Sequence, residues 1–229
     1  MSAPVKFSVG AVQVLDVDGV FAFAAGMAID VDGAPNAYHP PTLRHPISGR
    51  PPGLDDLRNA KSGKGWAGVV VGRDGKPIVQ GPSDPCPGFF VSQTALGDHS
   101  RLITDPRRYV DAVAVPYISL PPQFEHFAGL GDLAVVLRGS TSCGAIWADI
   151  GPSHRIGEAS PAVAASLGLY RGNPNDGHEA ADVVYALFPG TKSNPPWPRD
   201  DVAAAALLKF SGWGGLDRIR AQFPNLLVG

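Results

Sequence analysis

The sequence is poor in cysteine and has no long apolar run, and each shortage excludes a class of protein. Only two of its 229 residues are cysteines, Cys86 and Cys143. This rules out a dense disulfide framework and a four-cysteine zinc site, and it leaves either one disulfide or two buried free thiols. No run of 18 apolar residues occurs, so a membrane-spanning helix is not expected.

Charge is also scarce. Charged residues make up 17% of the chain, the net charge is −2, and the pair Arg107-Arg108 is not extended into a longer basic cluster. A nucleic-acid partner is therefore not expected. The six histidines show no metal-ligand spacing, so neither a metal nor a cofactor is expected. The apolar share of 44% suffices for a core, and the length fits one β-rich domain over residues 1–229, which we expect to be a monomer.

Glycine and proline are abundant instead. The 28 glycines and 23 prolines are nearly twice the average share of roughly 12%. They separate short apolar, β-branched runs, which is typical of many short strands joined by turns. The expected strands are Val9 to Val17, Val20 to Ala24, Met27 to Asp30, Ala67 to Val71, Ile78 to Gln80, Phe89 to Ser92, Ala114 to Ser119, Leu133 to Leu137, Ala145 to Ile150 and Val183 to Phe188. A hairpin turn is expected over residues 72–76, and an extended Pro-rich loop over residues 38–53.

Two helices are expected against this β-rich background. Ser160 as N-cap, Pro161 at the first helical position and Gly168 after the end delimit a short helix. A second helix is expected to begin near Pro198, to run to Phe210, and to resume over residues 216–223 after a Gly-Trp-Gly-Gly break.

Two carboxylates stand out as candidate catalytic groups. Asp149 ends a strongly apolar strand, and Glu158 lies just before the capped helix. A strand end, a Gly-Pro turn and a helix start can place such groups on opposite walls of a cleft, as a glycosidase requires. The alternative is structural: Asp149 caps the turn at Gly151, and Glu158 belongs to the helix N-terminus.

The segment around these two residues resembles a known family. Residues 147–152, WADIGP, and 155–160, RIGEAS, look like the catalytic signature of the glycoside hydrolase family 75 chitosanases. Further matches occur in the same order over about residues 20–215: IDVDGAPNAYHP at 29–40, GLD at 53–55, QG at 80–81, DP at 84–85, GFFVS at 88–92, TDPRRYVD at 104–111, PYI at 116–118, GD at 131–132 and FPG at 188–190. The resemblance implies endo-hydrolysis of β-1,4-linked glucosamine polymers with inversion, with Asp149 and Glu158 as the essential pair.

A second resemblance concerns the fold. Residues 149–168 look like the last part of a double-psi β-barrel, as in rare lipoprotein A, where a turn is followed by a short strand and an Ala-rich helix. We therefore expect a mainly β protein with a six-stranded double-psi barrel core, extended loops and a C-terminal helix.

Acid and base are assigned by analogy with barrel glycosidases. Glu158 would be the general acid and Asp149 the base that activates water. A helix N-terminus beside Glu158 favours the ionised carboxylate, however, and the apolar neighbours of Asp149 would raise its pKa, so the reverse assignment stays open.

Substrate recognition is expected to depend on charge and aromatic faces. Chitosan carries ammonium groups, so carboxylates should bind it and aromatic rings should stack on its sugars. The candidate carboxylates are Asp30, Asp32, Asp84, Asp105 and Asp132, and the candidate aromatic platforms are Tyr38 and Tyr117. Several of these aspartates also stand in ordinary turn dipeptides such as Asp84-Pro85.

Three features depart from the family resemblance. Asp16 and Asp18 interrupt the first apolar run, so no signal peptide is recognisable, and we expect a protein that acts outside the cell after removal of a signal or export by a specialised route. Arg44 and Arg50 lie in the Pro-rich loop and would disfavour a polycation, and residues 173–179 diverge from the family. The alternatives are therefore a muramidase-like peptidoglycan glycosidase and an expansin-like, non-catalytic polysaccharide-binding module.

Overall fold

The computed structural model describes residues 3–40, 53–63, 65–173, 177–193 and 201–226. Most of the expected Pro-rich loop at residues 38–53, including Arg44 and Arg50, lies outside these residues, as does the expected helix start near Pro198.

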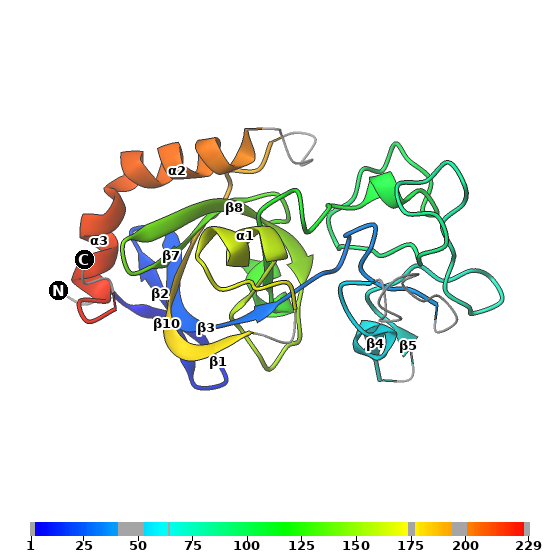
Figure 1. Cartoon of the computed structure of the whole chain (residues 1–229). Coiled ribbons are helices and arrows are strands. Elements are labelled where there is room, and N and C mark those ends of the chain that lie inside the picture. Colours follow the sequence, from blue (N-terminus) through cyan, green and yellow to red (C-terminus); the bar gives the residue numbers. More distant parts are fainter. Residues whose placement is uncertain (1–2, 41–52, 64, 174–176, 194–200, 227–229) are drawn as a thin grey trace.

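The protein is mainly β, and its centre is a six-stranded barrel of mixed strands (Figure 1). Around the barrel the strands follow one another in the order β3 (Val20–Ile29), β10 (His178–Phe188), β7 (Leu133–Arg138), β8 (Thr141–Ile150), β6 (Tyr117–Leu120) and β9 (Glu158–Ala159). Pairing of β9 with β3 closes the barrel. The β3–β9 and β6–β8 pairs are parallel and the other four are antiparallel.

The strands expected at Ala114 to Ser119, Ala145 to Ile150 and Val183 to Phe188 are β6, β8 and β10 with shifted bounds, and two other expectations differ more. The run Val9 to Val17 is a hairpin, β1 (Val5–Val9) and β2 (Val12–Val17), which extends β3 outside the barrel. The runs on either side of Gly26 form one long strand, β3. Gly26 is required there because a Cβ would come within 2.4 Å of a backbone oxygen of β10.

Apolar side chains fill the barrel. The rings of Phe23 and Tyr185 stack at 4.8 Å, and Phe124 contacts Trp147 edge-on. All four are fully buried. The barrel interior is thus a packed core, and any binding site must lie at an end or on the outside of the barrel.

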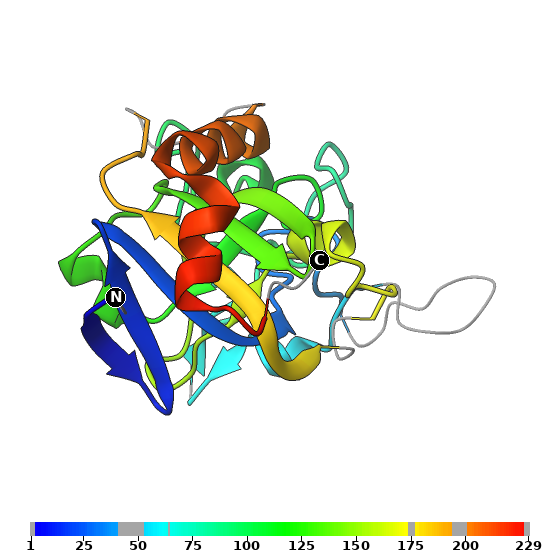
Figure 2. The same ribbon diagram turned by 90° about the vertical axis from the view of Figure 1, so that its left-hand side faces the viewer.

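The helices confirm the capping signals. α1 (Pro161–Ser166) follows Ser160, whose Oγ accepts the N–H of Val163 at 3.4 Å. α2 (Val202–Trp213) and α3 (Gly215–Gln222) meet at Gly214, which has a φ of +118° and so provides the expected break. Figure 2 shows α2 and α3 covering one side of the barrel, where α2 packs on β7 and β8. No helix among the described residues is long and apolar enough to cross a membrane.

Residues 31–40, 53–63 and 65–115 form a lobe beside the barrel, which we call the loop lobe (Figure 1). Its regular elements are short: η1 (Leu57–Ala60), β4 (Lys61–Ser62), β5 (Gly65–Trp66) and η2 (Pro106–Arg108). A further short helix, η3 (Pro122–His126), follows β6. An apolar cluster that includes Val69 and Val110 of the lobe continues into Tyr117 of the barrel, so the lobe has a core joined to that of the barrel.

Three strands expected in the loop lobe are present only as isolated bridges, Val69–Ser92, Val71–Pro77 and Val79–Phe90. Glycine and proline are frequent there and prevent longer ladders from forming. The expected turn at residues 72–76 is present, since the N–H of Gly72 donates to the carbonyl of Lys76 at 2.8 Å. Cys86 and Cys143 are free, which settles their state as thiols.

Candidate active site

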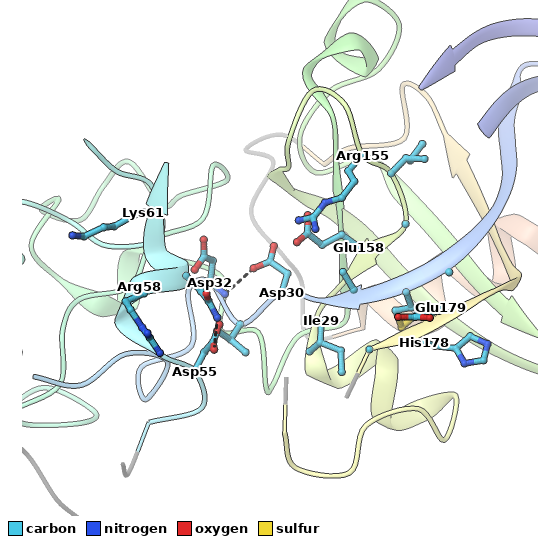
Figure 3. Close-up of a pocket in the computed structure, with 18 of the residues that line it drawn as sticks. Ile29, Asp30, Asp32, Asp55, Arg58, Lys61, Arg155, Glu158, His178 and Glu179 are labelled. Atoms are coloured by element: carbon cyan, nitrogen blue, oxygen red, sulfur yellow. Dashed lines mark hydrogen bonds between the residues drawn. The ribbon is translucent and has the colours of Figure 1, made fainter. Parts of the chain in front are cut away.

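A cleft of about 750 Å³ lies between one end of the barrel and the loop lobe (Figure 3). The barrel contributes the end of β3, the residues around β9 and the start of β10. The loop lobe contributes Tyr38, Asp55, Arg58, Asn59 and Lys61. Four carboxylates predicted from the sequence to be functional lie at or beside this cleft: Asp30, Asp32 and Glu158 line it, and Asp149 lies next to Asp30 and Asp32 without lining it.

Asp30, Asp32 and Asp149 form an acidic cluster. Each offers one oxygen atom, and these atoms lie within 4.8 Å of one another. One oxygen of each carboxylate is fixed: Oδ1 of Asp30 accepts the N–H of Asp32 at 2.9 Å, Oδ1 of Asp32 accepts the Tyr38 hydroxyl at 2.6 Å, and Oδ1 of Asp149 accepts the N–H of Ala95 at 2.6 Å. The spacing suits a hard cation or an ammonium group.

Strand register determines how Asp149 and Glu158 lie relative to each other. Ser119 of β6 is the pairing partner of Asp149 on one side and of Glu158 on the other. Paired residues share a face of the sheet, so both side chains lie on the face of Ser119, and two strand spacings separate their Cα atoms by about 10 Å. The sequence placed these carboxylates on two walls of a cleft, but only Glu158 lines the cleft directly.

The pKa of Glu158 is raised to about 7. Burial is the main cause, the negative charge of Asp30 adds to it, and Arg155 partly opposes it. These effects outweigh the helix N-terminus, which the sequence suggested would favour the ionised form. At neutral pH a large fraction of Glu158 is therefore protonated and able to donate a proton.

The pKa of Asp149 is raised well above its usual value. Burial is the largest cause, followed by the charges of Asp30 and Asp32. The pKa of Asp30 is also raised by burial, but hydrogen bonds, of which that from the Asp32 N–H is the strongest, oppose the shift. Hydrogen bonds therefore oppose the rise in pKa at Asp30, while neighbouring charges add to it at Asp149.

The hydroxyls of the two tyrosines predicted as aromatic platforms bind the aspartates of the site, that of Tyr117 through their backbone and that of Tyr38 through a carboxylate. Tyr117 is fully buried, and its hydroxyl donates to the carbonyls of Asp30 and Asp32 at 3.2 and 2.9 Å. Its ring cannot stack on a sugar, so that prediction is wrong. Tyr38 lines the cleft, but only 3% of it is exposed and its hydroxyl holds Asp32.

Three carboxylates predicted to bind substrate do not line this cleft. Asp84 binds Arg107 at 3.3 Å and closes a turn, and Asp105 caps η2 by accepting the N–H of Arg107 at 2.9 Å. Asp132 is 1% exposed and accepts three backbone N–H groups. Turns and caps already use oxygens of all three, and their role in substrate binding stays a prediction.

Sequence reasoning missed other residues at the site. Asp55, Arg58, Lys61 and Arg155 line the cleft. Asp55 and Arg155 stand in family-like motifs but were not predicted as site residues, and no motif contains Arg58 or Lys61. Ser119 was also missed, because its position opposite two carboxylates depends on a strand register that the sequence does not reveal.

Gly151 gives a direct test of how closely Glu158 is held. A Cβ at Gly151 would lie 2.7 Å from Oε2 of Glu158 and 3.1 Å from Oγ of Ser119. Gly151→Ala should displace the carboxylate and reduce kcat by about 10- to 100-fold, since misplacing a reacting group by 1 Å has effects of that size. The melting temperature should change little, because the end of a flexible side chain can move. Gly212→Ala is the control, since no atom lies within 4 Å of its Cβ. Unchanged kcat in Gly151→Ala would contradict the close contact.

A cleft lined by a protonatable glutamate and facing aspartates, at the end of a mainly β barrel, is the arrangement of a glycoside hydrolase. Comparison with known families agrees: the profile described as fungal chitosanase of glycosyl hydrolase group 75 matches residues 94–213, more than half of the chain. The chain belongs to this family. It is therefore a glycoside hydrolase whose family suggests chitosan as the substrate. No curated protein matches the sequence significantly. The matched residues include Asp149 and Glu158 but not Asp30 or Asp32.

Proposed function

We propose that the protein is an endo-acting chitosanase that cleaves β-1,4-linked glucosamine polymers with inversion at the anomeric carbon. The observation that carries this proposal is the position of Glu158, which lines the cleft, lies within the residues that match the family and has a pKa of about 7. Asp149 is the second essential carboxylate that the family motif implies. We further propose that residues 1–229 form one catalytic domain that acts outside the cell.

In the proposed reaction Glu158 donates its proton to the glycosidic oxygen while the bond from C1 to that oxygen breaks. Water attacks C1 from the opposite face, and its proton passes to a carboxylate of the acidic cluster, which is Asp149 in the assignment that the motif implies. The new reducing end is then the α-anomer.

The negative charge of the cleft supports a cationic substrate. Asp30, Asp32 and Asp55 line it on both the barrel and the loop-lobe side. An ammonium group at these carboxylates would relieve their mutual repulsion, whereas the neutral N-acetyl group of chitin would not.

The proposal also covers the topology of the barrel. We propose that it is a double-psi barrel, and the two parallel pairs β3–β9 and β6–β8 within the closed ring support this topology.

Proton NMR of fresh digests tests the mechanism. Chitosan should yield α-anomeric reducing ends before mutarotation, and the viscosity of the solution should fall much faster than reducing ends accumulate, as expected for internal cleavage. Initial β-anomers would contradict inversion, and a slow fall in viscosity would contradict endo action.

A second candidate is a peptidoglycan glycosidase. Arg58, Lys61 and Arg155 line the same cleft and would suit a glycan that bears carboxylates. Parallel incubation with chitosan, chitin and purified cell walls distinguishes the candidates. Turbidity loss of the walls without sugar release from chitosan would favour the peptidoglycan enzyme, and polysaccharide binding without any product would favour an expansin-like module.

A further inference from the structure

Asp30 lines the cleft together with Glu158, as Asp32, Asp55 and Glu179 also do, whereas Asp149 does not. Figure 3 shows the side chains of Asp30 and Glu158 directed toward the same space, with Asp32 and Asp55 farther along the opposite wall. A water molecule that attacks a sugar bound in this cleft would therefore meet Asp30 before Asp149.

The spacing of Asp30 and Glu158 leaves room for that water molecule. Ala28 pairs with Glu158 in the parallel β3–β9 ladder, and Asp30 follows Ala28 by two residues on the same face. One strand spacing combined with a rise of two residues puts the Cα atoms of Asp30 and Glu158 about 8 Å apart. In inverting glycosidases the two carboxyl groups are roughly 6.5–9.5 Å apart and hold both a sugar and a water molecule between them. Two side chains whose Cα atoms are about 8 Å apart and which both line the cleft can adopt such a separation.

The charges that act on Glu158 also favour Asp30 as the facing base. Asp30 is the carboxylate whose charge raises the pKa of Glu158, and Asp149 makes no such contribution. Asp149 is instead influenced by Asp30 and Asp32. A general acid is kept protonated by the ionised base that faces it, and Asp30 has this relationship to Glu158. The charge of Glu158 in turn contributes to the raised pKa of Asp32, which favours the protonated form of Asp32.

Hydrogen bonding also favours the ionised form of Asp30. Its Oδ1 accepts the N–H of Asp32 at 2.9 Å, and this hydrogen bond and the neighbouring polar side chains oppose the rise in the pKa of Asp30 that burial causes. Burial and the charges of Asp30 and Asp32 raise the pKa of Asp149 well above its usual value, so a protonated Asp149 can donate a hydrogen bond to Asp30.

We infer that Asp30 is the general base of this enzyme and that Asp149 is a positioning residue that acts through Asp30. This inference rests on the inverting reaction proposed above. Asp30 accepts one proton from the attacking water as the oxygen of that water bonds to C1, while Glu158 releases its proton to the leaving oxygen. Asp149 holds the Asp30 carboxylate in place from behind.

Azide rescue distinguishes the two assignments. Asp30→Ala should reduce kcat on chitosan by about 10²–10⁴-fold. Azide should then restore part of the activity and yield an α-glycosyl azide, because this anion attacks C1 without needing a base. Asp149→Ala should lose activity without rescue, and so should Asp32→Ala, the matched control from the same cluster. Rescue of Asp149→Ala or Asp32→Ala, with none for Asp30→Ala, would overturn the inference.

Carboxyl ¹³C NMR tests the pairing independently of activity. In Asp30→Asn the pKa of Glu158 should fall from about 7 toward its usual range, because the facing charge is gone. In Asp149→Asn it should stay near 7, since Asp30, Asp32, Tyr117 and Arg155 remain around the pair. The opposite result would overturn the inference. A wild-type protein that releases no sugar from chitosan would instead overturn the proposed function, while NMR would still show which aspartate faces Glu158.

Discussion

Glu158→Gln should reduce kcat on chitosan by about 10²–10⁴-fold, which is the range for loss of a general acid. Glutamine keeps the shape of the side chain but has no proton to give to the glycosidic oxygen. Burial and the charge of Asp30 raise the pKa of Glu158 to about 7, so a large fraction of Glu158 is protonated at neutral pH. Steady-state rates on chitosan measure the loss, and circular dichroism checks that the variant is folded.

The nature of the leaving group is the control for this variant. In a glucosamine-oligomer fluoride the leaving group is fluoride ion, which departs without protonation. Glu158→Gln should therefore hydrolyse this substrate at a rate close to that of the wild type. The wild-type kcat/KM on chitosan should fall as the pH rises above about 7, because Glu158 loses the proton it must donate. This fall in kcat/KM above about pH 7 should be absent when Glu158→Gln hydrolyses the fluoride substrate. Equal losses on both substrates would show that Glu158 is not the acid.

The parts of the fold that the sequence predicted well have local signals. Ser160, Pro161 and Gly168 mark both ends of α1, and glycine breaks the C-terminal helices where expected. Strand β9 could not be predicted because it has only two residues, Glu158 and Ala159. It exists because β3 and β6 pair with it from either side, which is a long-range condition.

The same distinction applies to the site. Asp149 and Glu158 were predicted from a motif, but their relation to the cleft depends on the register at Ser119, which is set by strands far apart in the sequence. Asp84 and Asp105, predicted to bind substrate, close a turn and cap a helix outside this cleft, because a binding aspartate and a turn-capping aspartate occur in the same short patterns. What separates them is whether neighbouring N–H groups have already taken their oxygens.

Asp149→Asn should stabilise the protein at pH 8 while it reduces activity. The pKa of Asp149 is raised well above its usual value in the folded protein by burial and by two neighbouring aspartates. In the unfolded chain it is ionised above about pH 4. Between these two pKa values the folded state holds a proton that the unfolded state has released, so the free energy of unfolding falls as the pH rises. Asparagine removes this penalty and keeps an acceptor for the Ala95 N–H. The gain in melting temperature should be close to zero at pH 4 and should grow toward pH 8.

Asp132→Asn is the matched control, and at neutral pH it should have the opposite sign. Oδ1 of Asp132 accepts the N–H groups of Thr191 and Lys192, and Oδ2 accepts that of Gly129, each at 2.8 Å. An amide has only one acceptor oxygen, so at least one buried N–H loses its partner, at a cost of about 1–3 kcal/mol. For a protein of this size each kcal/mol corresponds to roughly 2–4 °C in melting temperature. Calorimetry from pH 4 to 8 should therefore separate the two aspartates. Asp132 is a carboxylate whose two oxygens the fold uses as acceptors of backbone N–H groups, whereas Asp149 is one whose burial lowers the stability of the fold at pH 8. A melting temperature at pH 8 that falls in both variants would contradict this division.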